Sequence, residues 1–199
     1  MTGLSRFRKT ISCYFTNPVV RVLAKTPVTP NSLTFFNLIL ASGSVALIVS
    51  ANFLAAGIMV LVAGFLDMLD GALARHTNRI THFGAILDST IDRLAEGFIL
   101  LGILYFYANE GSISGILLTG SVLLVSFSVS YIKSRAEAAG IECSVGVFTR
   151  PERVIVLAIG LFINELDVTL YIIGIFSLFT VGQRLVYIRQ QIIKNSWRK

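Results

Sequence analysis

Charged residues are scarce in this chain of 199 residues: they make up 14% of it, while 54% of the residues are hydrophobic. Residues 31–66 contain no Asp, Glu, Lys or Arg at all. Residues 97–132 carry a single charge, Glu110, and residues 154–183 carry two, both acidic. A soluble domain of this length would have more charge and shorter apolar runs, so the composition excludes one. Because one membrane crossing takes about 20 apolar residues, the chain is predicted to cross several times.

Cysteine is nearly absent, and the two that occur, Cys13 and Cys143, are predicted to form no disulfide. The first thirty residues also lack the apolar core of about 7–15 residues that a cleaved signal peptide needs. Their apolar positions instead alternate with basic ones, as in a helix lying at a membrane interface. A solvated basic tail is the alternative interpretation of this segment.

Six apolar helices are predicted, separated by short breaks. They cover about residues 31–50, 53–75, 83–108, 113–137, 151–164 and 168–190. The expected fold is therefore an all-α polytopic membrane protein with six transmembrane helices and an N-terminal interfacial amphipathic helix. We expect residues 1–30 to form that interfacial segment and residues 31–199 to form one six-helix domain. The fifth span is short, and we expect its charged end to begin inside a cavity.

Lysine and arginine are distributed unevenly along the chain. The breaks between the first and second, third and fourth, and fifth and sixth spans contain neither residue. All 17 basic residues lie in the N-terminal segment, at 75–93, at 133–153 or from 184 onward. The positive-inside rule therefore predicts that both termini and the longer loops face the cytoplasm, in a plasma-membrane protein. The net charge of +6 then meets anionic headgroups, and no nucleic-acid partner is needed to explain it.

Four aspartates interrupt the apolar pattern of the second and third predicted helices: Asp67, Asp70, Asp88 and Asp92. Spacings of three or four residues place each pair on one helix face, and the short link 76–82 makes the two helices antiparallel neighbours. Four such close carboxylates cannot all stay ionised without cations. Either some are protonated, as in a proton or ion pathway, or they bind metal. A ligand set made only of oxygen suits Mg²⁺, Mn²⁺ or Ca²⁺ rather than zinc.

Small residues accompany these acids and leave room beside them. Gly71, Ala74 and Gly84 share the same helix faces and permit either close helix packing or a bound ligand. Neither histidine, His76 or His82, has the spacing of a metal ligand, so both are interpreted as surface residues of the connecting loop.

The acidic motif resembles the signature of a known enzyme family, the CDP-alcohol phosphatidyltransferases. All eight fixed positions agree: Asp67-x2-Asp70-Gly71-x2-Ala74-Arg75-x8-Gly84-x3-Asp88-x3-Asp92. The resemblance implies six spans, an amphipathic N-terminal helix and a homodimer. It also implies a reaction in which the hydroxyl of an alcohol displaces CMP from a CDP-linked lipid, with divalent metal.

The resemblance implies roles for particular residues. Asp67, Asp70 and Asp88 would hold one Mg²⁺ or Mn²⁺ ion, and Asp67, Asp88 and Asp92 would hold a second. Asp92 would also be the catalytic base that accepts the proton of the acceptor hydroxyl. Arg75 suits a phosphate because its guanidinium donates two parallel hydrogen bonds. The positions expected to bind the CDP-lipid are Pro30, Asn31, Ser32, Leu33, Gly71, Ala74, Arg75 and Thr81.

A second polar group, near the ends of the last three spans, points to an anionic acceptor. A neutral alcohol needs no cations, whereas a phosphomonoester with a charge of about −1.5 to −2 does. The stretches "LDSTIDR" and "YIKSRAEAAG…RPER" resemble the branch that uses L-myo-inositol-1-phosphate, the phosphatidylinositol-phosphate and archaetidylinositol-phosphate synthases. The positions that match the surroundings of the inositol phosphate are Ser130, Lys133, Arg135, Arg153 and Arg184. A phosphatidylglycerol-phosphate synthase acting on glycerol-3-phosphate is the main alternative.

Two further charged residues can be explained without a direct role in the reaction. Arg150 is explained by positive-inside anchoring. Glu96 lies one turn beyond Asp92 and outside the motif, so it is either a supporting group behind the site or a partner of Arg93. The identity of the lipid tail, diacylglycerol or archaeol, stays open because lipid grooves are built from generic apolar residues.

Two other classes of function are weaker explanations of the four acids. An ion-coupled transporter could use the carboxylates as a relay, but the second and third spans contain no proline and the chain shows no twofold repeat. A membrane scaffold would have no reason to embed four carboxylates, each of which costs about a few kcal/mol.

Overall fold

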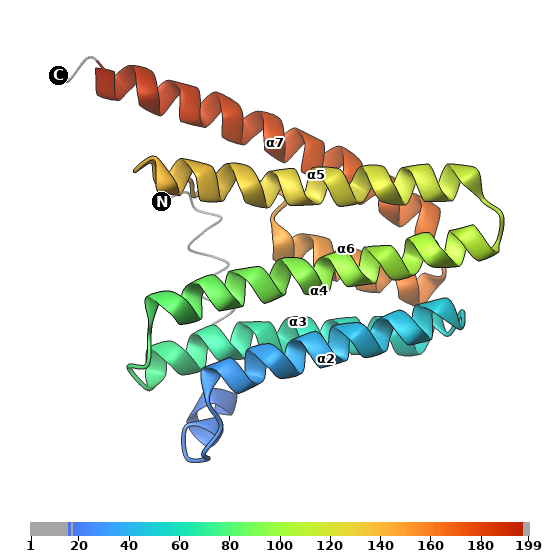
Figure 1. Cartoon of the computed structure of the whole chain (residues 1–199), viewed down its shortest axis with the longest axis horizontal. Helices are drawn as coiled ribbons and strands as arrows, with labels where there is room; N and C mark the ends of the chain where they lie inside the picture. Colours follow the sequence, from blue (N-terminus) through green and yellow to red (C-terminus); the bar gives the residue numbers. More distant parts are fainter. Residues whose placement is uncertain (1–15, 17, 197–199) are drawn as a thin grey trace.

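The computed structural model describes residues 16 and 18–196, and within this part every regular element is a helix (Figure 1). The helices are α2 (Pro30–Val49), α3 (Phe53–His76), α4 (His82–Asn109), α5 (Ile113–Ala138), α6 (Arg150–Ile163) and α7 (Leu166–Ser196). The predicted all-α class is confirmed. The predicted bounds agree closely, except that α7 continues beyond residue 190 to Ser196.

Four of the described helices are long and apolar enough to cross a membrane: α2, α3, α5 and α7, with mean hydropathies between 1.5 and 2.0. The helix α4 carries charged residues along its first half, and α6 has only 14 residues. Large apolar side chains are nevertheless exposed on all six helices, as on a surface that meets lipid. Examples are Phe35, Leu54, Phe98, Leu124, Ile159 and Ile175.

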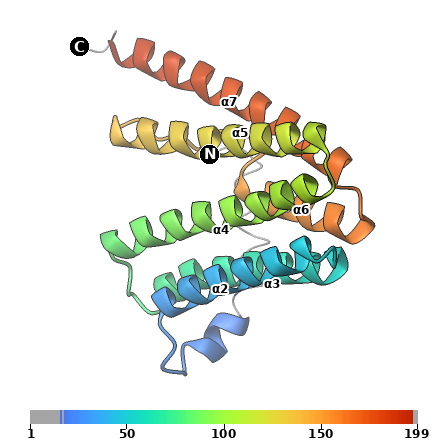
Figure 2. The ribbon, with the colours of Figure 1, turned by 45° about the vertical axis from the view of Figure 1, so that its right-hand side comes forward.

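The six helices pack side by side around a common apolar core (Figures 1 and 2). α2 packs against α3 and α4, and α5 packs against α4 and α7. The short helix α6 lies against α3 and α7, and so joins the two halves of the bundle. Small and branched apolar residues fill the centre without exposure to solvent, among them Ala41, Ile48, Ala56, Ile103 and Leu161.

The local sequence fixes where the helices near the acids begin. The backbone N–H of Ser32 donates to Thr29 Oγ1 (3.2 Å) and the backbone N–H of Thr29 donates to Ser32 Oγ (3.1 Å), which forms a capping box at the start of α2. Pro30 occupies the first turn, where its missing N–H is harmless. Thr81 caps α4, its Oγ1 accepting from the backbone N–H of Gly84 at 2.9 Å.

The N-terminal segment is described only in part. Residues 18–23 are helical, and Val20 packs with Leu33, Leu69 and Leu73 on α2 and α3. The predicted amphipathic pattern of residues 4–15 lies outside the described residues. Cys13 lies outside them too, while Cys143 is a free, buried thiol.

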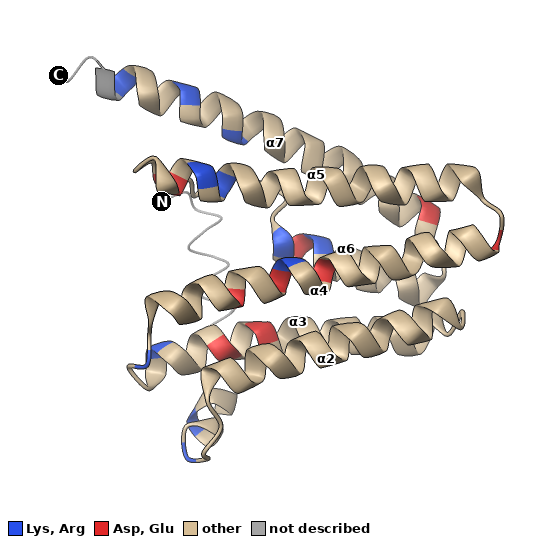
Figure 3. Cartoon of the chain, viewed as in Figure 1, with Lys and Arg blue, Asp and Glu red and all other residues tan. Residues whose placement is uncertain are grey.

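The connection between α5 and α6, residues 139–149, turns back into the bundle, so that α6 begins midway along α4 (Figure 1). Hydrogen bonds to α7 hold it, among them those of the backbone N–H of Phe148 to Thr180 Oγ1 (3.1 Å) and of Val147 to Gln183 Oε1 (3.2 Å). Figure 3 shows the charged start of α6 beside the charged residues of α4. The expectation that this short helix starts with its charged end inside the protein is met.

Candidate active site and metal centre

Three aspartates from two helices converge at one point of the bundle. One carboxylate oxygen from each of Asp67, Asp70 and Asp88 lies within 4.8 Å of the others. Asp67 and Asp70 come from the last two turns before the basic end of α3, and Asp88 comes from the second turn of α4. The antiparallel pairing of the two helices therefore brings together three of the four predicted aspartates, while Asp92, one turn further along α4, is not part of this group.

The donor set of this cluster fits a divalent cation. Asp67 Oδ1 and Asp88 Oδ1 are buried and have no hydrogen-bond partner. Buried polar atoms are almost always paired, so two orphaned carboxylate oxygens in one cluster require a cation or water. All the donors are carboxylate oxygens, the ligands that Mg²⁺ and Mn²⁺ prefer.

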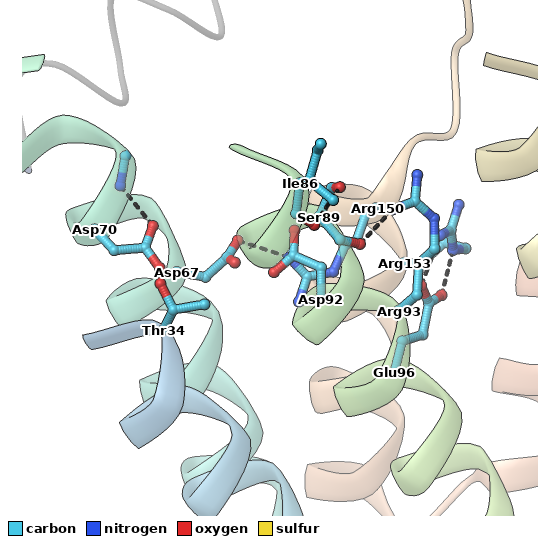
Figure 4. Close-up of polar contacts among 11 residues, drawn as sticks. Thr34, Asp67, Asp70, Ile86, Ser89, Asp92, Arg93, Glu96, Arg150 and Arg153 are labelled. Carbon is cyan, nitrogen blue, oxygen red and sulfur yellow. Dashed lines mark hydrogen bonds and ion pairs between the residues drawn. The ribbon is translucent and has the colours of Figure 1, made fainter. Parts of the chain in front are cut away.

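Asp70 is held in place by its neighbours. Its side chain is buried, and its Oδ2 accepts a hydrogen bond of 2.8 Å from Thr34 Oγ1 on α2 (Figure 4). Its Oδ1 accepts from the backbone N–H of Gly71. Sequence reasoning missed Thr34, although it follows directly on the "PNSL" stretch and so enters the site from the same helix end.

Arg150 lies between two of the predicted metal ligands. Its Nη1 is 2.7 Å from Asp67 Oδ2 and 2.7 Å from Asp92 Oδ1, and all three side chains are mostly buried (Figure 4). Anchoring at the membrane surface does not account for this position, so that interpretation of Arg150 was incomplete. Arg150 is the first residue of a short helix that was expected to begin inside a cavity, and this position could have indicated a contact with the aspartates.

A pocket of about 250 Å³ opens on one side of the aspartates, between the starts of α2 and α4 and the end of α3. A side chain larger than Gly71 or Ala74 would enter it, and a Cβ on Gly71 would lie 3.4 Å from the Arg75 guanidinium. The predicted CDP-lipid residues that line it are Pro30, Asn31, Gly71, Ala74, Arg75 and Thr81. Ser32 and Leu33 do not line it: Ser32 caps α2, and Leu33 packs against α3.

A second pocket, of about 420 Å³, opens on the opposite side of the cluster. Asp92 and Arg150 form its inner wall, and four of the five predicted acceptor residues also line it: Ser130, Lys133, Arg153 and Arg184. The fifth, Arg135, is exposed near the end of α5 and is not part of the lining.

Glu96 pairs with Arg153 rather than with Arg93. Arg153 Nε donates to Glu96 Oε1 at 2.6 Å and Arg153 Nη2 donates to Glu96 Oε2 at 2.8 Å. The prediction of an Arg93 partner was therefore wrong. Arg93 instead donates to the backbone carbonyl of Ser89 (Figure 4). It also donates to the hydroxyl of Ser134 on α5. Arg93 and Glu96 lie on adjacent turns of α4, but the guanidinium that reaches Glu96 is that of Arg153 on α6.

Arg184 fixes the wall of the second pocket. Its Nε donates to the carbonyl of Val145 in the 139–149 connection at 2.9 Å, and its Nη1 donates to the carbonyl of Val129 on α5. Lys133, by contrast, is half-exposed and lies 3.7 Å from Glu137 one turn away. The pocket therefore contains both a buried, hydrogen-bonded cation, Arg184, and a half-exposed one, Lys133.

The aspartates, with a motif-lined pocket and a basic pocket beside them, form a candidate metal centre that an anionic substrate can reach. The CDP-alcohol phosphatidyltransferase family model matches residues 27–186. The chain belongs to this family and is an enzyme of it, which confirms the resemblance of the acidic motif and makes the transporter and scaffold explanations unnecessary.

Relatives share almost the whole chain. The archaetidylinositol phosphate synthase of Methanothermobacter thermautotrophicus is 35% identical over 95% of this chain and 95% of that relative. The phosphatidylinositol phosphate synthase of Mycobacteroides abscessus is 33% identical, covering 87% and 83% of the two chains.

Solved structures agree with this assignment. The crystal structure of Mycobacterium tuberculosis phosphatidylinositol phosphate synthase with CDP-DAG bound has a TM-score of 0.79 at 31% identity, covering 87% of this chain and 92% of that one. The structure of the same enzyme with manganese and citrate has a TM-score of 0.77 at 30% identity, covering 87% and 88%.

Proposed function

We propose that this enzyme transfers a phosphatidyl-type group from a CDP-linked lipid to a hydroxyl of L-myo-inositol-1-phosphate and releases CMP. One observation carries the proposal. Two pockets flank the motif aspartates: Asp70 and Asp88 line one together with Gly71, Ala74 and Arg75, and Asp92 lines the other together with basic side chains. Relatives named for inositol-phosphate lipid synthesis support this acceptor over glycerol-3-phosphate.

The donor occupies the pocket of about 250 Å³ in this proposal. Arg75 and Thr81 contact the diphosphate and nucleotide, and the absence of side-chain bulk at Gly71 and Ala74 lets the ligand approach the α3 backbone. Pro30 and Asn31 close the pocket from the start of α2. The lipid chains lie outside, against the apolar faces of the helices.

Two divalent cations, Mg²⁺ or Mn²⁺, complete the centre. Asp67, Asp70 and Asp88 would hold one, and Asp67, Asp88 and Asp92 would hold the second. Bound there, the cations would neutralise the diphosphate and the charge that develops on the leaving CMP. The manganese complex of the mycobacterial relative and the orphaned oxygens of Asp67 and Asp88 support this assignment.

The acceptor occupies the pocket of about 420 Å³. Its phosphate is held by Ser130, Lys133, Arg153 and Arg184, whereas Arg135, which does not line the pocket, is assigned no contact. This anchoring turns one ring hydroxyl toward Asp92, the only carboxylate that lines this pocket among the described residues. Asp92 accepts the hydroxyl proton, the hydroxyl oxygen bonds to the lipid-linked phosphorus, and the phosphorus–oxygen bond to CMP breaks.

The membrane arrangement is also part of the proposal. All six helices are transmembrane segments of this domain, although the 14-residue α6 reaches only part of the way across by itself. Residues 1–30 are an interfacial segment, and residues 31–199 are the enzymatic domain. The basic ends of the helices, the termini and the active site face the cytoplasm at the plasma membrane. The enzyme acts as a homodimer. The four apolar helices and the shared end of the Lys and Arg residues in Figure 3 support this placement.

An acceptor panel tests the proposal. Purified full-length protein with Mn²⁺ is given CDP-diacylglycerol or CDP-archaeol, together with inositol-1-phosphate, glycerol-3-phosphate, inositol or serine, and CMP release is measured. We expect CMP release with inositol-1-phosphate and far less with free inositol. Preference for glycerol-3-phosphate would instead define a phosphatidylglycerol-phosphate synthase. The two lipid arms identify the tail, which the apolar surface does not specify.

A further inference from the structure

Arg150 belongs to both halves of the active site. Its Nη1 lies 2.7 Å from Asp67 Oδ2 and 2.7 Å from Asp92 Oδ1, and the same side chain lines the basic pocket. Its Nε is buried and has no hydrogen-bond partner. The guanidinium therefore contacts the two carboxylates through Nη1, while its Nε–H donor has no partner.

The backbone that carries Arg150 is anchored at a capped helix start. Arg150 is the first residue of α6, and Pro151 follows it. The preceding Thr149 donates through both its backbone N–H and its hydroxyl to Glu152 Oε2, at 2.8 and 2.6 Å. A capping box of this kind defines the helix start. A long side chain on a fixed helix start can exchange partners without any movement of the helices.

We propose that Arg150 is an internal counter-ion that competes with divalent metal for Asp67 and Asp92 and, when displaced, binds the anion in the basic pocket. Two buried carboxylates need a positive charge when no metal is bound, and the guanidinium supplies it. Metal held by these carboxylates would repel and displace the guanidinium, which would then add a cation to the pocket. Metal and anionic acceptor thus favour each other's binding, as linkage requires.

This inference rests on the proposed metal centre but not on the identity of the acceptor, so it is tested with Mn²⁺ and sulfate. Mn²⁺ affinity is measured on detergent-solubilised full-length protein from the electron paramagnetic resonance signal of free Mn²⁺, with and without sulfate. For the wild type, sulfate should raise Mn²⁺ affinity severalfold. Arg150→Gln should bind Mn²⁺ about tenfold or more tightly than wild type without sulfate, and sulfate should add nothing.

Three further variants separate competition from a general change in charge. Arg150→Lys should fall between wild type and Arg150→Gln, because it keeps the charge without the bridging fork. Lys133→Gln should keep wild-type Mn²⁺ affinity but show a smaller sulfate effect. Arg189→Gln, an exposed cation of α7, should match wild type in both measurements.

A second measurement covers the case in which Arg150→Gln is unstable. In the presence of a chelator, the melting temperature of Arg150→Gln should lie below that of wild type, since the carboxylates have lost their counter-ion. Saturating Mn²⁺ should reduce this difference in melting temperature. Mn²⁺ affinity equal to or below wild type in both Arg150 variants would overturn the inference, as would a wild type insensitive to sulfate. A wild type that binds no Mn²⁺ would overturn the proposed metal centre together with it.

Discussion

Arg153 and Glu96 form a two-pronged ion pair inside the bundle, joining α6 to α4. Only 2% of Arg153 and 9% of Glu96 is exposed to solvent. The pair directs one edge of the guanidinium at Glu96 and leaves Nη1 buried without a hydrogen-bond partner. Because Arg153 also lines the basic pocket, the pair sets the position of a cation that the acceptor phosphate would meet.

Glu96→Gln tests this positioning role. We expect the KM for inositol-1-phosphate to rise while the KM for CDP-lipid stays unchanged, because only the basic pocket is disturbed. Removing one member of a buried pair should also lower stability, by up to about 3–5 kcal/mol. Steady-state kinetics and thermal unfolding measure the two effects. Glu110→Gln, an exposed acid at the other end of α4, is the matched control and should change neither.

Asp67→Asn and Asp88→Asn should abolish turnover, because each residue is expected to contact both cations. Both proteins should still fold and should lose the rise in melting temperature that Mn²⁺ gives the wild type. Glu165→Gln, an exposed acid far from the cluster, should keep that rise. Wild-type activity in either aspartate variant at saturating Mn²⁺ would contradict a two-metal centre.

Asp92→Asn should keep CDP-lipid binding and lose most of the rate. An asparagine preserves the shape but cannot accept the hydroxyl proton, and general bases contribute about 10²–10⁴-fold. Equilibrium binding of CDP-lipid and single-turnover rates provide the two measurements. If binding and rate fall by the same factor, Asp92 is a ligand alone, and the proton goes to another group.

The two kinds of cation in the basic pocket should respond differently to removal. Arg184→Ala should raise the KM for inositol-1-phosphate about ten- to a hundredfold. It should also lower the melting temperature, because it releases the carbonyls of Val145 and Val129. Lys133→Ala should raise the same KM more mildly and leave the melting temperature unchanged, since its pairing with Glu137 is exposed. Equal losses of CDP-lipid affinity in both variants would argue that the pocket is not the acceptor site.

Ala74→Leu should act on the donor alone. The added side chain would enter the pocket of about 250 Å³ and compete for space with the CDP moiety. The KM for CDP-lipid should rise severalfold or more, while the KM for inositol-1-phosphate should not change. Kinetics with each substrate varied in turn will show this pattern, the reverse of that expected for Lys133→Ala.

Much of this architecture could be predicted from the sequence because its signals are local. The helix ends coincide with charges, caps and breaks that follow long apolar runs, so five helices lie within two residues of their predicted bounds and only the end of α7 was missed. The Asp67, Asp70 and Asp88 cluster follows from helical spacing and one short loop, since two antiparallel helices leave little choice of register.

The partners of the arginines could not be predicted, because they depend on a distant connection. Residues 139–149 fold back and place the start of α6 opposite α4, and that placement brings Arg150 to Asp67 and Arg153 to Glu96. Sequence spacing within α4 suggested Arg93 as the partner of Glu96. Arg153 on α6 is the partner instead, because its guanidinium donates two hydrogen bonds to the carboxylate.

The shortness of α6 has a consequence for how the two substrates meet. Its 14 residues make about 21 Å of helix, less than the roughly 30 Å of a hydrocarbon core, and the pocket of about 420 Å³ opens beside its first turn. In the proposed reaction, a water-soluble sugar phosphate can therefore reach the level of a lipid headgroup. The lipid substrate then need never be lifted out of the bilayer, and its hydrocarbon chains remain solvated by neighbouring lipids.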